Sequence, residues 1–150
     1  MTSRIRSFLL PVFVTALLLS ACGARQAGAN PDGSVNVNVT LTDFGIESSV
    51  KRFTPGVKYR FLVTNEGQIA HEFMLMPVAM DNMGMSDLSN MSMEEKDAMA
   101  LMVIPQDELP AGARAERDYT FTSAPRGKIE MVCTLPGHYE AGMHVPVDFE

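Results

Sequence analysis

Three side chains that bind soft metal ions recur at equal spacing near the end of the chain. Cys133, His138 and Met143 form the pattern C-x4-H-x4-M, with four residues between each pair of neighbours. One proline and two glycines lie between them, where they allow the backbone to bend. A thiol, an imidazole and a thioether could therefore converge on one point from a single short loop.

The softness of these groups indicates which metal they would bind. Thiolate and thioether sulfurs select copper, and imidazole tolerates it; two imidazoles, one thiolate and a weak, distant methionine are the ligands of blue-copper sites. The loop supplies only one of the two histidines that such a site needs. The chain has two others, His71 and His144. His71 begins a strand-like run at residues 71–76, so it could reach the loop from a neighbouring strand.

A second motif strengthens this interpretation. The loop at residues 133–143 and the pattern N-x-G-x3-H-x-F at residues 65–73 together resemble the cupredoxin family of small blue copper proteins. The spacing of the loop is nearer to that of auracyanin and rusticyanin than to that of plastocyanin. The likeness covers residues 35–150. It implies an all-β, Greek-key sandwich or barrel with one short helix in a methionine-rich insertion.

The resemblance also implies a set of ligands. One type 1 copper would be held by His71, Cys133 and His138, with Met143 as a weak axial ligand. In the family the strand-borne histidine is buried, and the loop histidine reaches the surface through an apolar patch where redox partners dock. By this likeness His138 would be the port for electrons. The residues expected around it are Leu135, Pro136, Tyr139 and Ala141.

Neighbours of these ligands depart from the family pattern. Plastocyanin and azurin have asparagine after the first histidine, whereas this chain has Glu72. We expect the Glu72 carboxylate to accept a hydrogen bond from Thr134 and so to join the two ligand segments. Ala70 stands where azurin has a glycine, which argues against a fifth, carbonyl ligand. We expect His144 to point away from the site; turned inward, it would be a stronger fourth ligand.

Alternation of apolar and polar residues predicts short strands over much of the chain. The clearest run, at residues 35–42, reads VNVNVTLT. Turns rich in proline and glycine separate the runs. This pattern predicts an antiparallel, all-β sandwich or barrel. The expected strands are residues 35–42, 57–64, 71–76, 115–121, 128–133 and 145–149.

One stretch has the features of a helix. Ser92-x-x-Glu95 has the form of a capping box, and residues 93–103 then read as a single short helix that ends before Pro105. The same region concentrates methionine, since nine of the twelve methionines lie within residues 74–102.

Two interpretations of these methionines stay open. Methionine fills irregular gaps in cores, and this would explain Met74 and Met76 on one face of a strand. It would also explain Met91, Met99 and Met102 as residues that bury the helix against the sandwich. Thioethers are also soft ligands for Cu(I), and segment 80–85 resembles methionine-rich segments of exported copper-handling proteins. The candidate secondary Cu(I) ligands are Met80, Met83, Met85, Met91 and Met93.

The amino terminus resembles that of a bacterial lipoprotein precursor. Two arginines precede an apolar run, residues 8–19, that has signal-peptide length and is too short to span a bilayer as a helix. It ends in a lipobox-like Leu-Ser-Ala-Cys, in which Cys22 would carry the lipid. We therefore expect a signal peptide at 1–21, a lipidated cysteine and flexible tether at 22–34, and one domain at 35–150. An ordinary secretory peptide or an uncleaved anchor is the alternative.

The two cysteines then have different roles. An exported chain with two cysteines would ordinarily form one disulfide, so a bridge between Cys22 and Cys133 is an alternative. If Cys22 carries lipid, Cys133 is unpaired, and a bound metal would protect its thiol in an oxidising compartment. The implied location is the cell envelope, lipid-anchored, with the domain facing the periplasm or the extracellular side.

The acidic balance of the chain narrows the choice of partners. Its net charge is −6, and removal of residues 1–21, which hold two arginines and no acidic residue, makes it −8. This charge argues against nucleic acid or an anionic membrane surface and favours a basic protein, although an acidic surface that merely keeps the domain soluble is equally consistent. We expect a monomer that is held to the membrane through lipid on Cys22 and docks redox proteins near His138.

The resemblance implies a carrier that shuttles single electrons between redox partners, and not an enzyme. Copper oxidases and nitrite reductases need further histidines for a second copper centre, and no pair of nucleophile and base is visible. The alternative, from another class, is an envelope copper-binding or copper-resistance protein that binds or hands on Cu(I). A structural zinc on Cys133 and two histidines is disfavoured, because a closed zinc site has no use for an axial-methionine loop.

Overall fold

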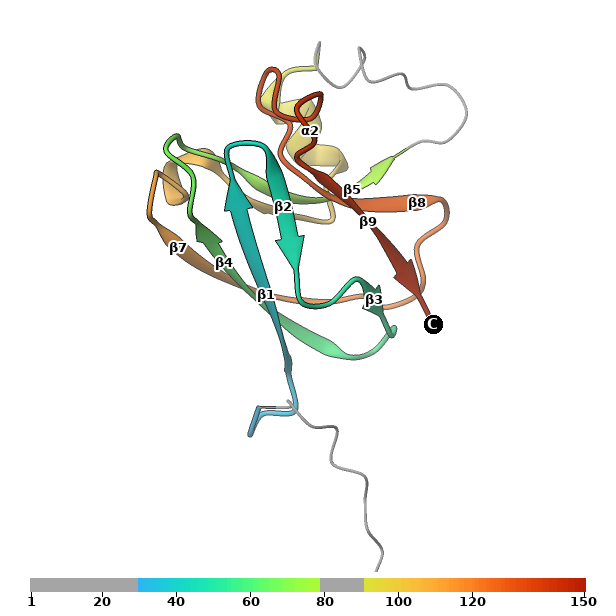
Figure 1. The fold of residues 1–150 in the computed structure, drawn as a ribbon. Coiled ribbons are helices and arrows are strands. Elements are labelled where there is room, and N and C mark those ends of the chain that lie inside the picture. Colours follow the sequence, from blue (N-terminus) through green and yellow to red (C-terminus); the bar gives the residue numbers. More distant parts are fainter. Residues whose placement is uncertain (1–29, 79–90) are drawn as a thin grey trace, which may run out of the picture.

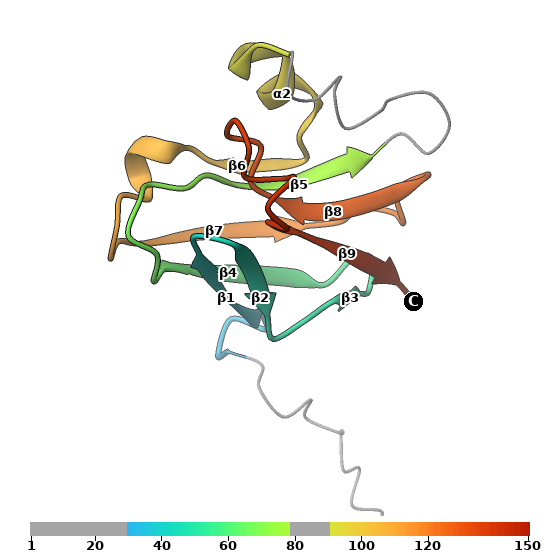
Figure 2. The same ribbon diagram turned by 45° about the horizontal axis from the view of Figure 1, so that its top comes forward.

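Two β-sheets face each other and form a sandwich (Figures 1 and 2). The computed structural model describes residues 30–78 and 91–150. Its strands are β1 (Val35–Thr42), β2 (Gly45–Ser48), β3 (Arg52–Phe53), β4 (Lys58–Asn65), β5 (Phe73–Val78), β6 (Met102–Ile104), β7 (Arg114–Thr120), β8 (Lys128–Val132) and β9 (His144–Phe149). One sheet has the order β2-β1-β4-β7 and the other β3-β9-β8-β5-β6. The predicted all-β sandwich is therefore confirmed.

Alternation along β1 and β4 creates the face of the first sheet that packs against the second. From Val37 in β1 and from Tyr59 in β4, every second residue is buried, and the residues between them are more exposed. The inward hydrophobic residues are Val37, Val39, Leu41, Tyr59, Phe61 and Val63. Burial of one such side chain contributes about 1.5–3 kcal/mol, so this face supplies much of the stability of the sandwich.

Two strand pairs are parallel, and the expectation of a purely antiparallel sandwich is wrong in this respect. β1 pairs with β4 in parallel, and β3 pairs with β9 in the same way. Between β1 and β4 the chain forms β2 and then β3, which belongs to the other sheet, before it returns beside β1. Alternation of residues reports which face is buried and not the direction of the neighbouring strand, so the sequence pattern could not reveal this crossover.

The helical prediction is correct at its start and wrong at its end. Helix α2 (Met93–Met99) begins at the predicted capping box, in which Ser92 and Glu95 bond each other's backbone N–H. It stops at Ala100, whose backbone is extended. Residues 102–104 form β6 on the edge of β5, and residues 106–108 form a 3-10 turn, η1 (Gln106–Glu108). Pairing with β5 therefore outweighs the local helical pattern, and β-branched residues at the end of β6 suit a strand.

The two ends of the sandwich differ in what they carry. Phe53 in β3 contacts four aromatic side chains, with ring centroids 4.8–6.3 Å apart, and this cluster fills the core near the carboxyl terminus. The described chain also begins, at residue 30, at this end (Figure 1). The β1–β2 turn and the β8–β9 loop lie at the opposite end, and helix α2 lies beside the β8–β9 loop.

Candidate metal centre

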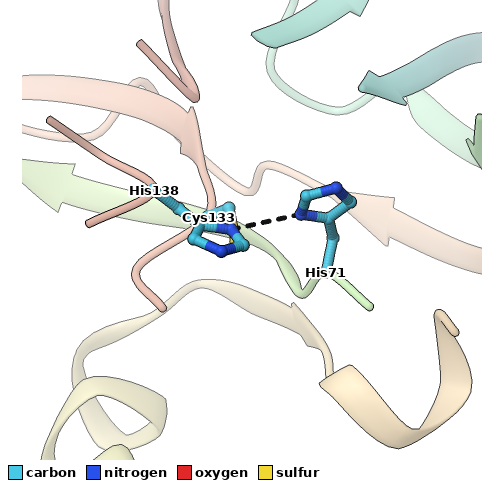
Figure 3. Close-up of side chains that lie close together, drawn as sticks. All are labelled: His71, Cys133 and His138. Atoms are coloured by element: carbon cyan, nitrogen blue, oxygen red, sulfur yellow. Dashed lines mark hydrogen bonds between the residues drawn. The ribbon is translucent and has the colours of Figure 1, made fainter. Parts of the chain in front are cut away.

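Three of the predicted ligands meet at the end of the sandwich that carries the β8–β9 loop. Nδ1 of His138 lies 3.2 Å from Nδ1 of His71 and 3.3 Å from Sγ of Cys133. The donor atoms of all three residues lie within 4.8 Å of one another (Figure 3). His71 and Cys133 are fully buried, whereas His138 is half-buried. In the part of the chain that the structure describes, this is the one group of three His, Cys, Asp or Glu residues arranged to hold a metal ion.

Strand register explains why residues so far apart in sequence converge. β5 and β8 are antiparallel neighbours, with Met74 opposite Val132. His71 lies just before β5, and Cys133 follows directly after β8. Both residues therefore lie at the same end of two neighbouring strands. The loop from Cys133 to β9 folds back and places His138 over them.

Hydrogen bonds within the β8–β9 loop hold its two ends together. The N–H of Cys133 donates to the carbonyl of Met143 at 3.0 Å, and the N–H of Met143 donates to the carbonyl of His138 at 3.0 Å. Gly137 and Gly142 have φ values of 81° and 108°, which few other residues adopt. Met143 is fully buried beside Cys133 in the core. Its thioether as an axial ligand stays a prediction.

The N-x-G-x3-H motif builds a rigid support beneath His71. The side-chain amide of Asn65 donates to the carbonyls of Ile69 and Leu109 at 2.8 and 2.9 Å, and its oxygen accepts the N–H of Gly67 at 2.9 Å. The N–H of His71 itself donates to the carbonyl of Leu109 at 3.1 Å. The segment before β5 is thus fixed to the loop that follows η1.

Asp43, which no sequence pattern indicates, faces Nε2 of His71. Its Oδ1 accepts the N–H of Gln68 at 2.8 Å and lies 3.5 Å from Nε2 of His71. At this distance the negative charge of Asp43 attracts the N–H dipole of His71, although the two groups are not aligned well enough for a hydrogen bond. Burial and the nearby His138 hold the pKa of His71 below its ordinary value. A neutral ring with its proton on Nε2, toward Asp43, directs the lone pair of Nδ1 into the centre.

Glu72 joins the two ligand segments as predicted. Its Oε1 accepts hydrogen bonds from the backbone N–H of Thr134 at 2.8 Å and from the Thr134 hydroxyl at 2.7 Å. Glu72 is fully buried, and its other oxygen, Oε2, has no hydrogen-bond partner among the described residues. The segments that carry His71 and Cys133 are therefore locked to each other by adjacent residues.

The thiol of Cys133 is almost fully protonated at neutral pH in the absence of a metal. Burial raises its pKa to about 11, although the N–H groups of Glu72 and Leu135 act in the opposite direction. A metal ligand must be a thiolate, so binding must displace this proton. The two N–H groups are placed to stabilise the resulting sulfur anion.

Metal loading at pH 8 is expected to release about one proton per bound ion. Cys133 supplies it, because its pKa lies well above this pH, while the lowered pKa of His71 leaves that imidazole already neutral. Titration in unbuffered solution with a pH electrode measures the release. The Cys133→Ser variant is the control and should release no proton. Release close to zero from the unaltered protein would mean that the thiolate exists before the metal arrives.

His144 points away from the three donors, as expected. Its ring stacks on Tyr139, with centroids 4.3 Å apart and planes 2° apart, and its Nδ1 lies 3.4 Å from Oε2 of Glu130 without the alignment of a hydrogen bond. Tyr139 donates to the same carboxylate oxygen at 2.6 Å. The final strand begins at His144. Side chains alternate between the two faces of a strand, so the side chain of His144 points away from the site.

The surface around His138 differs in part from the expected patch. Pro136 and Ala141 are exposed and Leu135 is half-buried, but Tyr139 is 8% exposed and bonded to Glu130, so it contributes little to the surface. Two exposed hydrophobic side chains near the site were not predicted: Phe44, 76% exposed, whose carbonyl lies beside Gly142, and Ile69, 48% exposed, whose N–H lies near Asp43.

The described methionines are divided between packing and exposure. Met74 and Met76 are fully buried in a second, smaller cluster with Val132 and Tyr139, as the core interpretation predicts. Met91 packs partly against this cluster, and Met93 is 41% exposed. Met102 is buried in the main core, on β6 and not on a helix, and Met99 is half-buried. Met80, Met83 and Met85 lie outside the described residues.

The predictions for the amino terminus also fall outside the described residues. They comprise the signal peptide at 1–21, the lipidated Cys22 and most of the tether at 22–34. Cys133 has a free, buried thiol. No helix among residues 30–78 and 91–150 combines the length and the apolar character that a membrane span requires.

The three donor groups are of the types that bind copper. A thiolate and two imidazole nitrogens, buried and held by a second layer of hydrogen bonds, match the ligands of mononuclear copper sites. The fold agrees with this chemistry. Reduced auracyanin from Roseiflexus castenholzii superimposes with a TM-score of 0.58 at 16% identity, over 77% of this chain and 96% of that one. Reduced rusticyanin gives 0.54 at 16% identity, over 78% and 79%. The chain thus has the cupredoxin fold.

Sequence comparison identifies the particular family. The copper-resistant cuproprotein CopI of Pseudomonas aeruginosa is 30% identical over 140 residues, which cover 73% of this chain and 73% of the relative. CopI of Rubrivivax gelatinosus is 35% identical over 106 residues, 65% of this chain and 59% of that protein. No family model matches the chain. This protein belongs to the CopI family of cuproproteins.

Proposed function

We propose that this protein binds one copper ion at His71, Cys133 and His138, with Met143 as a weak fourth ligand, and that it acts in copper resistance. The observation that carries the proposal is the convergence of these three donors in a member of the CopI family. Thiolate and thioether ligands favour copper over the harder ions. A bound copper would supply one-electron chemistry between Cu(I) and Cu(II).

The residues of the chain prepare this site before any metal enters. His71 is held by the carbonyl of Leu109 and faces Asp43, and Cys133 is held by the carbonyl of Met143. The Glu72 to Thr134 bonds keep the two segments in register. A site fixed in this way needs little rearrangement, and burial of two donors excludes water from the sulfur.

A second candidate function is electron transfer. The likeness of the fold to auracyanin and rusticyanin favours it, as does the half-exposure of His138 between two buried ligands. Redox partners would then dock over His138, in a brief encounter of small area. Both functions use the same copper site, and neither requires a substrate pocket at the metal, so we propose that the protein is not an enzyme.

We also propose that the protein works in the cell envelope, held by lipid on Cys22, as a monomer and without nucleic-acid partners. The described chain begins at the end of the sandwich opposite the site (Figure 1). An anchor at the amino terminus would therefore join the domain at the end far from the metal site.

The decisive experiment joins a spectrum to a growth test. The purified protein loaded with Cu(II) is expected to show an intense thiolate-to-copper band and to bind one copper, and a strain that lacks the gene should lose growth in elevated copper. The unaltered gene should restore growth, and a gene with Cys133→Ser should not. Unimpaired growth of the deletion strain, together with an intact band, would favour the electron carrier. Absence of the band would exclude the proposed site.

The methionine-rich segment gives this experiment a further arm. If it binds Cu(I), excess Cu(I) should raise the stoichiometry above one, and replacement of Met83, Met85, Met91 and Met93 by leucine should return it to one. An electron carrier with packing methionines should bind one copper before and after these changes.

A further inference from the structure

Helix α2 places a buried lysine against the ligand loop. Lys96 is 3% exposed and is the one buried lysine or arginine among the described residues. Its Nζ donates to the carbonyl oxygen of Thr134 at 2.9 Å. An ammonium is costly to remove from water. A lysine that only belonged to the solvated face of the helix would therefore be exposed, and the burial of Lys96 is unusual.

The surroundings of Lys96 connect it to both ligand segments. Thr134 follows Cys133 directly, and its N–H and hydroxyl bond Glu72, which follows His71. A series of hydrogen bonds thus links Lys96 in helix α2 to Thr134 and Glu72, which are the sequence neighbours of Cys133 and His71. Figures 1 and 2 both show α2 beside the β8–β9 loop.

Hydrogen bonds at the two ends of helix α2 hold Lys96 against the β8–β9 loop. The capping box of Ser92 and Glu95 fixes the first turn of α2, and the N–H of Lys96 donates to the carbonyl of Ser92 at 3.1 Å. Leu101, just beyond the helix, donates its N–H to the carbonyl of Leu75 in β5 at 2.7 Å. The helix is thus fixed to the sheet at its end, and the side chain of Lys96 has a defined position.

We propose that Lys96 is a positioning residue that tunes the copper site, because its buried positive charge favours Cu(I) over Cu(II) and so raises the reduction potential. This inference rests on the proposed copper site. With one thiolate and two neutral imidazoles, the site has no net charge as Cu(I) and a charge of +1 as Cu(II). A cation buried nearby opposes the second state, and a buried charge is screened less than a surface charge. The same cation also favours ionisation of Cys133, against the effect of Glu72.

The charge can be separated from the hydrogen bond with two substitutions. Lys96→Met removes both and keeps a long, flexible side chain, whereas Lys96→Gln removes the charge and keeps an N–H donor for Thr134. Lys128→Gln is the matched control, because Lys128 is exposed at the start of β8, the end of that strand far from Cys133. It changes the net charge of the protein by the same amount.

The main measurement is the midpoint potential of each copper-loaded variant, read from the thiolate-to-copper band. At a fixed applied potential, the ratio of Cu(I) to Cu(II) is expected to fall by about tenfold in both Lys96 variants. It should change less than about twofold in the control, and only the shift from the buried charge should persist in high salt. Equal midpoints in all four proteins, with the band intact, would overturn the proposal and leave Lys96 as an anchor of helix α2.

A second measurement needs no copper. In the metal-free protein, an uncharged alkylating reagent should modify Cys133 several-fold more slowly in both Lys96 variants, because less thiolate is present. If the unaltered protein forms no copper band, the proposed copper site has failed and the role of Lys96 in its potential fails with it, whereas an intact band with equal midpoints refutes the role of Lys96 alone. Circular dichroism identifies any variant that does not fold, in which case the other Lys96 variant supplies the comparison.

Discussion

Replacement of Cys133 by serine is expected to abolish the thiolate-to-copper band and to weaken copper binding by at least about 100-fold. Loss of an outer partner of a ligand costs about 10–100-fold in metal affinity, and Cys133 is itself the sulfur donor at 3.3 Å from His138. A serine hydroxyl does not ionise at neutral pH and offers oxygen in place of a soft sulfur. Affinity is measured by competition with a chromophoric Cu(I) chelator, and the band by absorption after Cu(II) loading.

His144→Ala is the matched control for this experiment. His144 is the histidine outside the convergent group, since it stacks on Tyr139 and faces Glu130. Its loss should leave both the band and the affinity within about threefold of the unaltered protein. A variant that loses the band on removal of His144 would show that this ring turns inward on metal binding, and the ligand set would need revision.

Spacing in the sequence was sufficient to locate two of the three donors for a simple geometrical reason. Cys133 and His138 are near each other in the chain, so two bends in the loop can bring them together. His71 lies at the same edge of the sheet because β5 and β8 are adjacent and antiparallel. Its distance in sequence is large, and only the resemblance to a known fold predicted this proximity. Their convergence is confirmed, and their role as copper ligands stays a prediction.

The contact between Glu72 and Thr134 was predictable for the same reason. If the β5–β8 register continues past Met74 and Val132, it places these two residues opposite each other. An acid and a hydroxyl that follow two expected ligands on neighbouring strands are then within hydrogen-bonding distance, and the structure shows both bonds.

Other parts of the site could not be predicted, because they depend on contacts between elements that the sequence does not order. Asp43 lies in the β1–β2 turn, and no local pattern indicates that this turn approaches His71. Lys96 lies in a helix whose sequence is otherwise that of a solvated surface, and its burial follows from how α2 docks on the loop. The end of α2 was predicted too late, since β6 gains its strand structure from pairing with β5.

Gly67→Ala is expected to destabilise the protein by about 1–3 kcal/mol and to weaken copper binding by about 10–100-fold. A methyl group at this position would overlap Oδ1 of Asp43, lie 2.8 Å from Nε2 of His71 and lie 3.1 Å from Oδ1 of Asn65. At least one of these groups must move. His71 and Asn65 are fully buried, so neither has free space beside it. Urea unfolding of the metal-free protein measures the first effect, and chelator competition measures the second.

Gly45→Ala separates crowding from the general effect of losing a glycine. A methyl group at Gly45 would contact only Oγ1 of Thr42, at an ordinary 3.5 Å. This variant should therefore match the unaltered protein in copper affinity, and it should unfold at an equal or slightly higher urea concentration, because alanine restricts the unfolded chain. If the two variants behaved alike, the close approach of Asp43 to His71 would have no energetic importance. A loss of affinity confined to Gly67→Ala would instead show that the space beside Nε2 controls how His71 presents its other nitrogen to copper.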